Sequence, residues 1–171
     1  MALPQSQKNA PDAATTVLGG GPSMSSIKPR PLILVDLDGT LFDMEHRVHF
    51  LAEKNYDAFF EAVKDDTPIW WCAELVAAMA SRGFRIAFVS GRNEVARAET
   101  KRQLEKLGFG EFPLYMRPRY DYREDYLIKA DIFDRWFLNE NILFVIDDRS
   151  QVVKMWRERG LTVLQCAEGN F

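Results

Sequence analysis

Short apolar runs alternate along the chain with longer segments in which apolar residues recur at helical spacing. The short runs predict strands, and the longer segments predict helices between them. This alternation is typical of an α/β fold with a parallel sheet and right-handed crossovers. The strands are expected at 32–36, 84–89, 112–116, 142–146 and 161–165, and the helices at 46–64, 72–82, 93–107, 123–138 and 149–159.

The first 30 residues do not share this pattern. Ala, Ser, Pro, Gly and Gln dominate them, and apolar periodicity is absent. We therefore expect residues 1–30 to form a flexible tail in front of one domain over residues 31–171. A glycine-rich run at 19–26 is superficially similar to a phosphate-binding loop. It lacks the G-K-[ST] ending and a preceding strand, so it predicts no kinase activity.

Composition and charge narrow the class of protein. The 171 residues, of which 47% are hydrophobic, suffice for one sizeable core. The formal net charge of −3 gives no general attraction for nucleic acid, so any such binding must come from a local patch. The two cysteines show no C-x-x-C spacing. Because we find neither a signal-peptide h-region nor an apolar run of about 18 residues, we expect a soluble cytoplasmic protein.

The most informative run follows the first predicted strand. Pro31-Leu-Ile-Leu-Val-Asp-Leu-Asp-Gly-Thr40 carries two carboxylates, Asp36 and Asp38, into a turn made by Gly39 and Thr40. Strand alternation directs both carboxylates the same way, and the glycine opens the backbone to a substrate. The pattern indicates a nucleophile site for phosphoryl transfer. The alternative is an acidic cap at a strand-to-turn junction.

Three further motifs follow in chain order. Ser90-Gly91-Arg92 ends the second predicted strand and is suited to phosphate binding through the serine hydroxyl and the adjacent backbone N–H groups. Lys129 lies in a predicted helix, and Asp147 and Asp148 end the fourth predicted strand. Because ligands of open α/β sheets bind beyond the carboxyl ends of the strands, these groups are expected to converge on one crevice with the first motif.

Each of these motifs also has a structural alternative. The turn at Ser90 is typical of a helix N-cap as well, and a helical lysine such as Lys129 is usually solvated. Asp148 is equally suited to capping the following helix while Asp147 binds a metal ion.

The candidates for a nucleic-acid patch are arginines. Acidic residues interleave with those near residue 120, so this segment is nearly neutral, and a mixed solvated surface is the alternative. Trp70 and Trp71 are expected to pack in the core, with base stacking as the less favoured role. His46 and His49 have no further ligand at suitable spacing, which argues against a transition-metal site. The arginines are Arg47, Arg117, Arg119 and Arg123.

The ordered set D-x-D-G-T, S-G-R, a lone lysine and D-D resembles the haloacid dehalogenase superfamily of aspartate-nucleophile phosphatases over about residues 31–171. The resemblance implies a three-layer, Rossmann-like fold whose five-stranded parallel sheet has the order 5-4-1-2-3. Between Thr40 and Ser90 there is room for only a short helical cap insert, at about 43–70, and not for a separate cap domain. The stretches 123–129, 146–157 and 165–171 are similar to the 3′-phosphatase domain of phage polynucleotide kinase/phosphatase.

The chemistry of the motifs indicates a role for each group. Asp36 would attack phosphorus to form an aspartyl-phosphate, and Asp38 would protonate the leaving alkoxide and then deprotonate the hydrolytic water. Ser90 and Lys129 would complete the charge clamp around the phosphate. Hard oxygen ligands suit Mg²⁺. The metal candidates are Asp36, Asp38 or a backbone carbonyl near it, Asp147 and Asp148. The substrate-binding candidates are Thr40, Gly91, Arg92, Arg47, Arg117, Arg119 and Arg123.

The leading interpretation is a Mg²⁺-dependent polynucleotide 3′-phosphatase that acts on DNA or RNA ends in end repair, without a membrane partner. A short insert leaves an open site that admits a polymer end. The phage resemblance also implies a phage-encoded protein in a bacterial host. One alternative is a phosphatase for a nucleotide or another small phosphate monoester. A second alternative is a receiver-like module phosphorylated as a switch, which the order of the motifs and the presence of Asp38 argue against.

Overall fold

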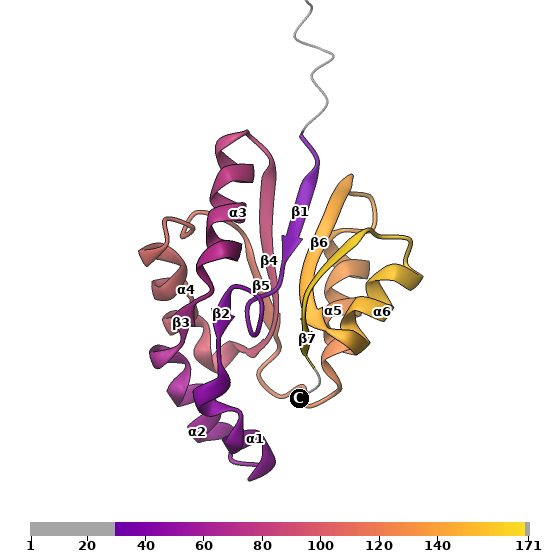
Figure 1. Cartoon of the computed structure of the whole chain (residues 1–171). Helices are drawn as coiled ribbons and strands as arrows, with labels where there is room; N and C mark the ends of the chain where they lie inside the picture. The colour runs from indigo at the N-terminus through magenta and orange to yellow at the C-terminus, as the bar shows by residue number, and fades with distance from the viewer. Residues whose placement is uncertain (1–29, 170–171) are drawn as a thin grey trace, which may run out of the picture.

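The computed structural model describes residues 30–169, which form a central sheet with helices on both faces (Figure 1). Five strands, all paired in parallel, form the sheet in the order β5-β4-β1-β6-β7. The predicted tail, apart from Arg30, and the run at 19–26 lie outside the described residues. The strands are β1 (Leu32–Val35), β4 (Arg85–Asn93), β5 (Leu114–Arg117), β6 (Ile142–Arg149) and β7 (Val163–Gly169).

The strand order agrees with the order implied by the resemblance. β1, β4, β5, β6 and β7 are the five predicted strands in chain order, so the observed order is 5-4-1-2-3 read from the opposite edge. The strand numbers differ because β2 (Phe42–Asp43) and β3 (Thr67–Pro68) form a separate antiparallel pair that the sequence did not predict. The α/β fold class is therefore confirmed.

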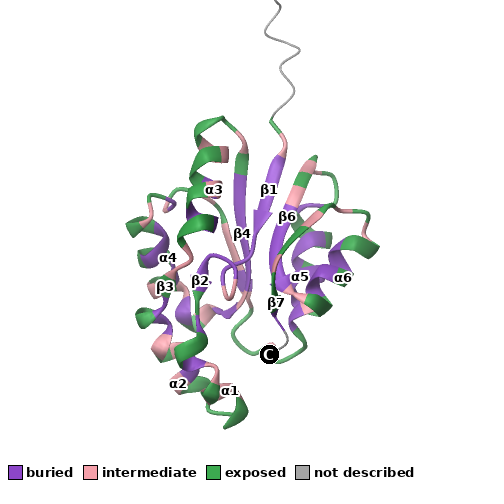
Figure 2. Cartoon of the chain, viewed as in Figure 1, coloured by how far each residue is buried: buried purple, intermediate pink, exposed green. Residues whose placement is uncertain are grey.

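Alternation along β1 divides the core between the two faces of the sheet. Leu32 and Leu34 pack with residues of α5 and α6, whereas Ile33 and Val35 pack with residues of α3 and α4. All four side chains are buried (Figure 2), as expected for a parallel strand covered on both sides. Within residues 30–169, no helix combines the length and the apolar character needed to span a membrane. The main helices are α3 (Trp70–Ser81), α4 (Arg97–Lys106), α5 (Asp125–Trp136) and α6 (Ser150–Glu158).

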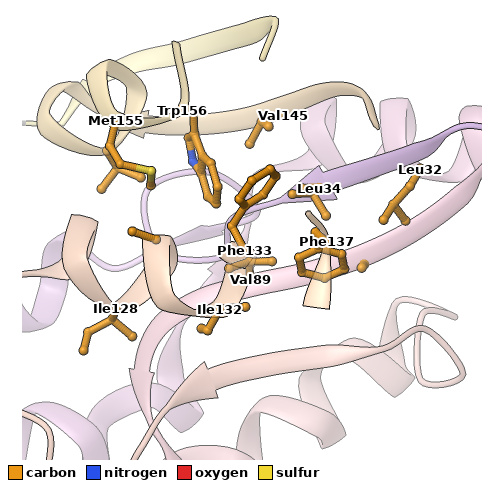
Figure 3. Close-up of a cluster of buried hydrophobic side chains, with 13 residues drawn as sticks. Leu32, Leu34, Val89, Ile128, Ile132, Phe133, Phe137, Val145, Met155 and Trp156 are labelled. Carbon is orange, nitrogen blue, oxygen red and sulfur yellow. The ribbon is translucent and has the colours of Figure 1, made fainter. Parts of the chain in front are cut away.

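One core cluster connects directly to the polar end of the sheet. Trp156 of α6 is fully buried and meets Phe133 of α5 edge-on, with ring centroids 5.9 Å apart (Figure 3). The Nε1 of Trp156 donates a hydrogen bond of 3.2 Å to Asp147 Oδ2. A buried tryptophan needs a partner for this donor, so the packing of α6 also orients a carboxylate near the end of β6.

The segment between β2 and β3, called the insert below, differs from the prediction of one helix over 46–64. Lys54 adopts a left-handed conformation with a φ of 55°, and the Asn55 side chain caps the next helix by accepting a hydrogen bond from Ala58 N. The prediction of a continuous helix is therefore wrong. The pieces are 3₁₀ helix η2 (Glu45–Arg47), α1 (His49–Ala52), α2 (Tyr56–Glu61) and 3₁₀ helix η3 (Ala62–Asp65).

Four of the strands end later than predicted, β5 by one residue and β7 at Gly169, and the extensions of β4 and β6 concern the motifs. β4 continues through Asn93 and β6 through Arg149, so the S-G-R and D-D motifs lie within the strands. The pairing register shifts at each motif, between Ser90 and Asn93 in β4 and between Asp147 and Arg149 in β6. Such irregular pairing is common beside active sites, where it redirects side chains.

Candidate active site

A cavity of about 290 Å³ lies at the carboxyl end of the sheet, between the insert and the loop that connects β5 to α5. The strand arrows in Figure 1 point toward this end, where α1 and α2 also lie. The cavity lining includes Asp36, Asp38, Gly91, Lys129 and Asp148. The motifs that are far apart in the sequence therefore meet in one crevice, as the parallel sheet predicts.

Lys129 is a buried cation of this cavity. Its Nζ lies 2.7 Å from Asp36 Oδ1, 2.9 Å from Asp147 Oδ2 and 3.3 Å from Asp125 Oδ2. Asp125 and Lys129 are one turn apart on α5, so the helix places both side chains beside the ends of β1 and β6. The Lys129 side chain is only 1% exposed, which excludes the alternative of a solvated helical lysine.

Burial and like charge raise the pKa of Asp36. Removal of the carboxylate from water is the largest cause, Lys129 opposes it, and the carboxylates of Asp147 and Asp148 add to it. Burial also raises the pKa of Asp147. Burial and repulsion from Asp147 raise the pKa of Asp148 to about 6. The single positive charge of Lys129 therefore does not balance the carboxylates of this cluster, which keeps an excess of negative charge.

Asp36, Asp147 and Asp148 form a group suited to a metal ion. Each offers one carboxylate oxygen, and these atoms lie within 4.8 Å of one another. A divalent cation would relieve the excess negative charge, and an all-oxygen donor set suits Mg²⁺. The side chain of Asp38, which the sequence also predicts as a ligand, is not part of this group.

A hydrogen bond orients Asp148, and two glycines leave the space that its carboxylate occupies. Thr40 Oγ1 donates to Asp148 Oδ1 over 3.3 Å. A Cβ atom at Gly39 or Gly169 would overlap the Asp148 carboxylate, so both positions require glycine. The capping alternative for Asp148 is not supported, because the N-cap of α6 is Arg149 and no side chain accepts a capping hydrogen bond there. Arg149 N instead donates to Asp147 Oδ1 over 3.2 Å.

Asp38 is held by two buried arginines that share a second carboxylate, Asp66. Arg47 Nη2 and Arg92 Nε each donate to Asp38 Oδ1 over 2.7 Å. Arg47 Nε donates to Asp66 Oδ1 over 2.7 Å, and Arg92 Nη2 donates to Asp66 Oδ2 over 2.5 Å. Both arginines are at most 1% exposed. Removing one member of a buried charge network leaves its partner uncompensated, so the four residues depend on one another.

This network alters the roles expected for Arg47 and Arg92. The sequence predicts both as substrate-binding residues, but their guanidinium groups are engaged by carboxylates, and Arg92 Nη1 also donates to Gln103 Oε1 over 2.8 Å. Burial alone would raise the pKa of Asp38, but Arg92 and Arg47 outweigh it and hold the pKa below its usual value. The two arginines thus position Asp38 and keep it ionised in the resting site.

Ser90 and Gly91 lie where β4 meets the start of α5. Ser90 is buried, and its Oγ accepts a hydrogen bond of 3.1 Å from Arg92 N. A Cβ atom at Gly91 would overlap the Asp125 carboxylate, so glycine permits the close approach of β4 and α5. The helix-cap alternative for Ser90 is not supported, because Asn93 caps the following 3₁₀ helix.

The loop between β5 and α5 carries the other predicted arginines. Arg117 Nε donates to the Gly91 carbonyl over 2.8 Å, and Arg117 Nη1 donates to the Arg123 carbonyl over 2.5 Å, so Arg117 braces the loop. Arg123 Nη2 lies 2.6 Å from carboxylate oxygens of both Asp121 and Asp131. These pairs offset much of the charge of Arg123 at the mouth of the cavity.

Arg119 lies further out on the same loop. Its side chain is exposed, and the guanidinium carbon is 5.7 Å from the centroid of the Tyr120 ring. Its backbone carbonyl accepts a hydrogen bond of 2.9 Å from Asn93 Nδ2, which anchors the loop to the end of β4. The side chain of Arg119 therefore extends into solvent from the outer part of this loop, outside the lining of the cavity that contains Asp36.

Among the charged and polar residues of the site, Asp66, Asp125 and Trp156 were not predicted. The sequence contains a signal for Asp125, because it lies four residues before Lys129 in a predicted helix. It contains no comparable signal for Asp66, which follows Lys64 and another aspartate in an ordinary polar run. Trp156 lies in a predicted helix, but only packing shows that its donor reaches a carboxylate.

Two aromatic pairs singled out in the sequence lie outside the cavity lining. Trp70 and Trp71 begin α3 and are 65% and 53% exposed, so the expectation that they pack in the core is wrong. The histidines belong to the insert, with His46 in η2 and His49 at the start of α1.

Residues 30–171 match the family described as "Polynucleotide kinase PNKP phosphatase domain". The chain is 33% identical over 128 residues to a "Putative bifunctional polynucleotide kinase/RNA ligase" of Autographa californica nuclear polyhedrosis virus. That match covers 74% of this chain and 18% of the viral protein. A chain in the "Structure of the Pnkp1/Rnl/Hen1 RNA repair complex" is similar with a TM-score of 0.71 and 30% identity, over 93% of this chain and 48% of that chain.

A more distant similarity concerns the fold alone. A structure described as "Phospho-Aspartyl Intermediate Analogue of Phosphoserine phosphatase" has a TM-score of 0.54 and 19% identity, over 82% of this chain and 88% of that chain. The chain thus spans most of that phosphatase, about half of the chain from the RNA repair complex, and a minor part of the viral relative.

Proposed function

The chain belongs to the family of polynucleotide kinase PNKP phosphatase domains, and on this basis we propose that it is a Mg²⁺-dependent polynucleotide 3′-phosphatase in nucleic-acid end repair. Its substrate would be a 3′-terminal phosphate of DNA or RNA, hydrolysed through an aspartyl-phosphate intermediate. The observation that carries the proposal is the pairing of Asp36 with Lys129 at 2.7 Å inside an open cavity, beside carboxylates suited to a metal ion.

The first step forms a bond between Asp36 and phosphorus. A carboxylate oxygen of Asp36 attacks in line with the bond to the 3′ oxygen, and that bond breaks with its electron pair on the oxygen. Asp38 transfers a proton to this leaving oxygen. Asp38 is ionised in the resting site, so it must take up a proton from solvent before it can act as an acid, and the arriving phosphate would favour this by raising the pKa of Asp38 through like-charge repulsion.

The second step releases Asp36. Water attacks the phosphorus of the aspartyl-phosphate, the bond between phosphorus and the Asp36 oxygen breaks, and inorganic phosphate forms. Asp38, which lost its proton in the first step, accepts a proton from the water. The two arginines hold Asp38 in position and keep it in the unprotonated form that can accept this proton, although the same contacts lower its proton affinity.

Positive charge and backbone donors would hold the phosphate during both steps. Lys129 lies beside Asp36, and Ser90 and Gly91 are proposed to contact the nonbridging oxygens. Mg²⁺ bound by Asp36, Asp147 and Asp148 would supply further positive charge against the repulsion between substrate and nucleophile. Burial and the neighbouring carboxylates raise the pKa of Asp36, so a cation bound beside Asp36 would favour the carboxylate form that attacks phosphorus.

A phosphatase for a nucleotide or another small phosphate monoester would use the same carboxylates. The polynucleotide substrate is favoured because an exposed loop with Arg119 continues beyond the mouth of the cavity, where a polymer would extend. A receiver-like switch is disfavoured, because Asp38 lines the same cavity as Asp36 and would promote hydrolysis of the phosphorylated form.

The proposed substrate is tested with three phosphate esters: a 3′-phosphorylated oligonucleotide, the same oligonucleotide with a 5′-phosphate, and a nucleoside 3′-monophosphate. We expect kcat/KM to be highest for the first, by about tenfold or more over the mononucleotide, because further nucleotides add binding outside the cavity. The 5′-phosphorylated oligonucleotide is the control of equal length and charge, and its hydrolysis should be slow. Preference for the mononucleotide would favour the small-substrate alternative.

The acid role of Asp38 predicts a dependence on the leaving group. In Asp38→Asn, formation of the phosphoenzyme from a 3′-phosphorylated nucleotide should slow by about 10²–10⁴-fold, which is typical for loss of a general acid. Formation from p-nitrophenyl phosphate should slow far less, because nitrophenolate needs little protonation. Rapid-quench measurement of the burst isolates this step from hydrolysis of the aspartyl-phosphate.

Asp65→Asn is the matched control, because it removes an exposed carboxylate of the insert. Both bursts should be unchanged in this variant. Equal slowing for the two esters in Asp38→Asn would argue that Asp38 maintains the site and does not transfer the proton.

A further inference from the structure

One wall of the cavity takes no part in the phosphoryl chemistry described above. This wall comes from the insert and is apolar and largely aromatic, whereas the residues around Asp36 are charged. On the loop between β5 and α5, Tyr122 adds another ring to the cavity lining. The wall residues are Met44, Leu51, Tyr56, Phe59 and Phe60.

Two tyrosines of this cavity are exposed, although an aromatic ring is stabilised when it leaves water. Tyr56 in α2 is 48% exposed, and Tyr122 is 78% exposed. One belongs to the insert and the other to the loop between β5 and α5, and both border the cavity that contains Asp36. Exposed rings gathered at a catalytic cavity indicate a surface for an apolar part of a ligand.

The aromatic wall is fixed in position relative to Asp38. Phe59 is buried, and the guanidinium carbon of Arg47 lies 4.2 Å from the centroid of its ring. Arg47 in turn donates to Asp38. Phe60 contacts Phe59 edge-to-face, with centroids 5.4 Å apart. A group seated on this wall is therefore held at a defined position relative to the proposed acid/base.

A nucleobase is the group beside a phosphate that fits this surface. It is flat and presents a π-face, whereas a sugar or glycerol phosphate has no comparable apolar face. The wall offers rings and aliphatic carbons but few hydrogen-bond donors, so it cannot distinguish the edges of different bases. The cavity of about 290 Å³ holds roughly ten water molecules at about 30 Å³ each, which is space for one nucleotide and not for a base pair.

We propose that the base of the 3′-terminal nucleotide stacks on Tyr56 and Tyr122, with little preference among the bases. The inference rests on the proposed function, because it takes the reacting phosphate to belong to a nucleotide end. Loss of one stacking contact of this kind corresponds to about tenfold in kcat/KM.

The test compares two substrates that differ only in the terminal base. One is a 3′-phosphorylated oligonucleotide, and the other carries a tetrahydrofuran abasic analogue at its 3′-phosphorylated end. Tyr56→Ser and Tyr122→Ser should each lower kcat/KM by about tenfold on the first substrate and leave the second unchanged. Tyr56→Phe should keep the wild-type kcat/KM on the first substrate, because phenylalanine retains the stacking face. Exchanging the terminal base of the first substrate should change kcat/KM by less than about threefold.

Tyr120→Ser is the matched control, because Tyr120 is 77% exposed on the same loop as Tyr122 but does not line the cavity. The ratio of kcat/KM between the two substrates should be unchanged in this variant. Equal losses on the two substrates in Tyr56→Ser and Tyr122→Ser, or no loss on either, would overturn the stacking proposal. Thermal unfolding of each variant shows whether a loss reflects misfolding.

If the chain is not a polynucleotide 3′-phosphatase, the experiment gives a different result. In that case the wild-type enzyme leaves 3′-phosphorylated oligonucleotides intact but hydrolyses nucleoside 3′-monophosphates. The same variants are then compared on a nucleoside 3′-monophosphate and on ribose 3-phosphate. A loss confined to the nucleotide would support stacking by Tyr56 and Tyr122 at a small-molecule site, and equal effects on both would exclude it.

Discussion

The Asp36→Asn variant is expected to lose turnover by several orders of magnitude and to keep its fold. The amide preserves the shape of the side chain but cannot attack phosphorus. The substitution also removes repulsion with Asp147 and Asp148, and Lys129 keeps Asp147 and Asp125 as partners. The unfolding temperature of the metal-free protein should therefore be unchanged or higher.

Two measurements check this prediction. Steady-state hydrolysis of a 3′-phosphorylated oligonucleotide gives the loss of turnover, and the intact mass of rapidly quenched protein detects the phosphoryl adduct, expected only with Asp36 present. Asp134→Asn is the control, because it removes an exposed carboxylate of α5 that pairs with Arg159. A phosphoryl adduct or normal turnover in Asp36→Asn would contradict the assignment of Asp36 as the nucleophile.

Removal of divalent metal is expected to abolish turnover, and added Mg²⁺ to restore it. The carboxylates of Asp36, Asp147 and Asp148 repel one another, and Lys129 offsets only part of their charge. A cation that binds the folded chain and not the unfolded chain also raises stability by RT ln(1 + [L]/Kd). Mg²⁺ should therefore raise the unfolding temperature of EDTA-treated protein in a concentration-dependent manner.

The Asp147→Asn variant tests the position of this ion. Its unfolding temperature should respond weakly or not at all to Mg²⁺, whereas Asp134→Asn should respond like the wild type. Full turnover after EDTA treatment would argue against metal dependence. A Mg²⁺ response that survives in Asp147→Asn would place the ion outside the three-carboxylate group.

Much of the fold could be predicted because it depends on residues that are neighbours in the chain. The uninterrupted apolar run of β1 (Leu32–Val35) is what a strand buried on both faces requires, and the structure buries every one of its side chains. The insert was predicted less well, since the helical spacing over 46–64 gave no weight to Lys54 and Asn55, where the chain turns. The left-handed conformation of a lysine has no strong local signal.

In the candidate site, too, some features could be predicted from the sequence and others could not. The candidate carboxylates and Lys129 were predicted to meet, because their spacing relative to the strands places them at one edge of a parallel sheet. Arg123 shows the limit of this reasoning, because Asp131, one of its two partners, comes from the following helix and not from the loop itself. The sequence therefore identifies a basic residue but does not show whether a carboxylate from another segment already pairs with it.

The amino-acid sequence by itself determined the α/β class and the carboxylates at the ends of β1 and β6, which follow from periodicity and spacing within short segments of chain. The strand order came only from the resemblance of the motifs to the haloacid dehalogenase superfamily. Only the tertiary structure decided that Arg47 and Arg92 bind Asp38 together with Asp66, and that Tyr56 and Tyr122 border one cavity. These groups come from separate segments, and buried charges and rings acquire partners only when those segments pack together.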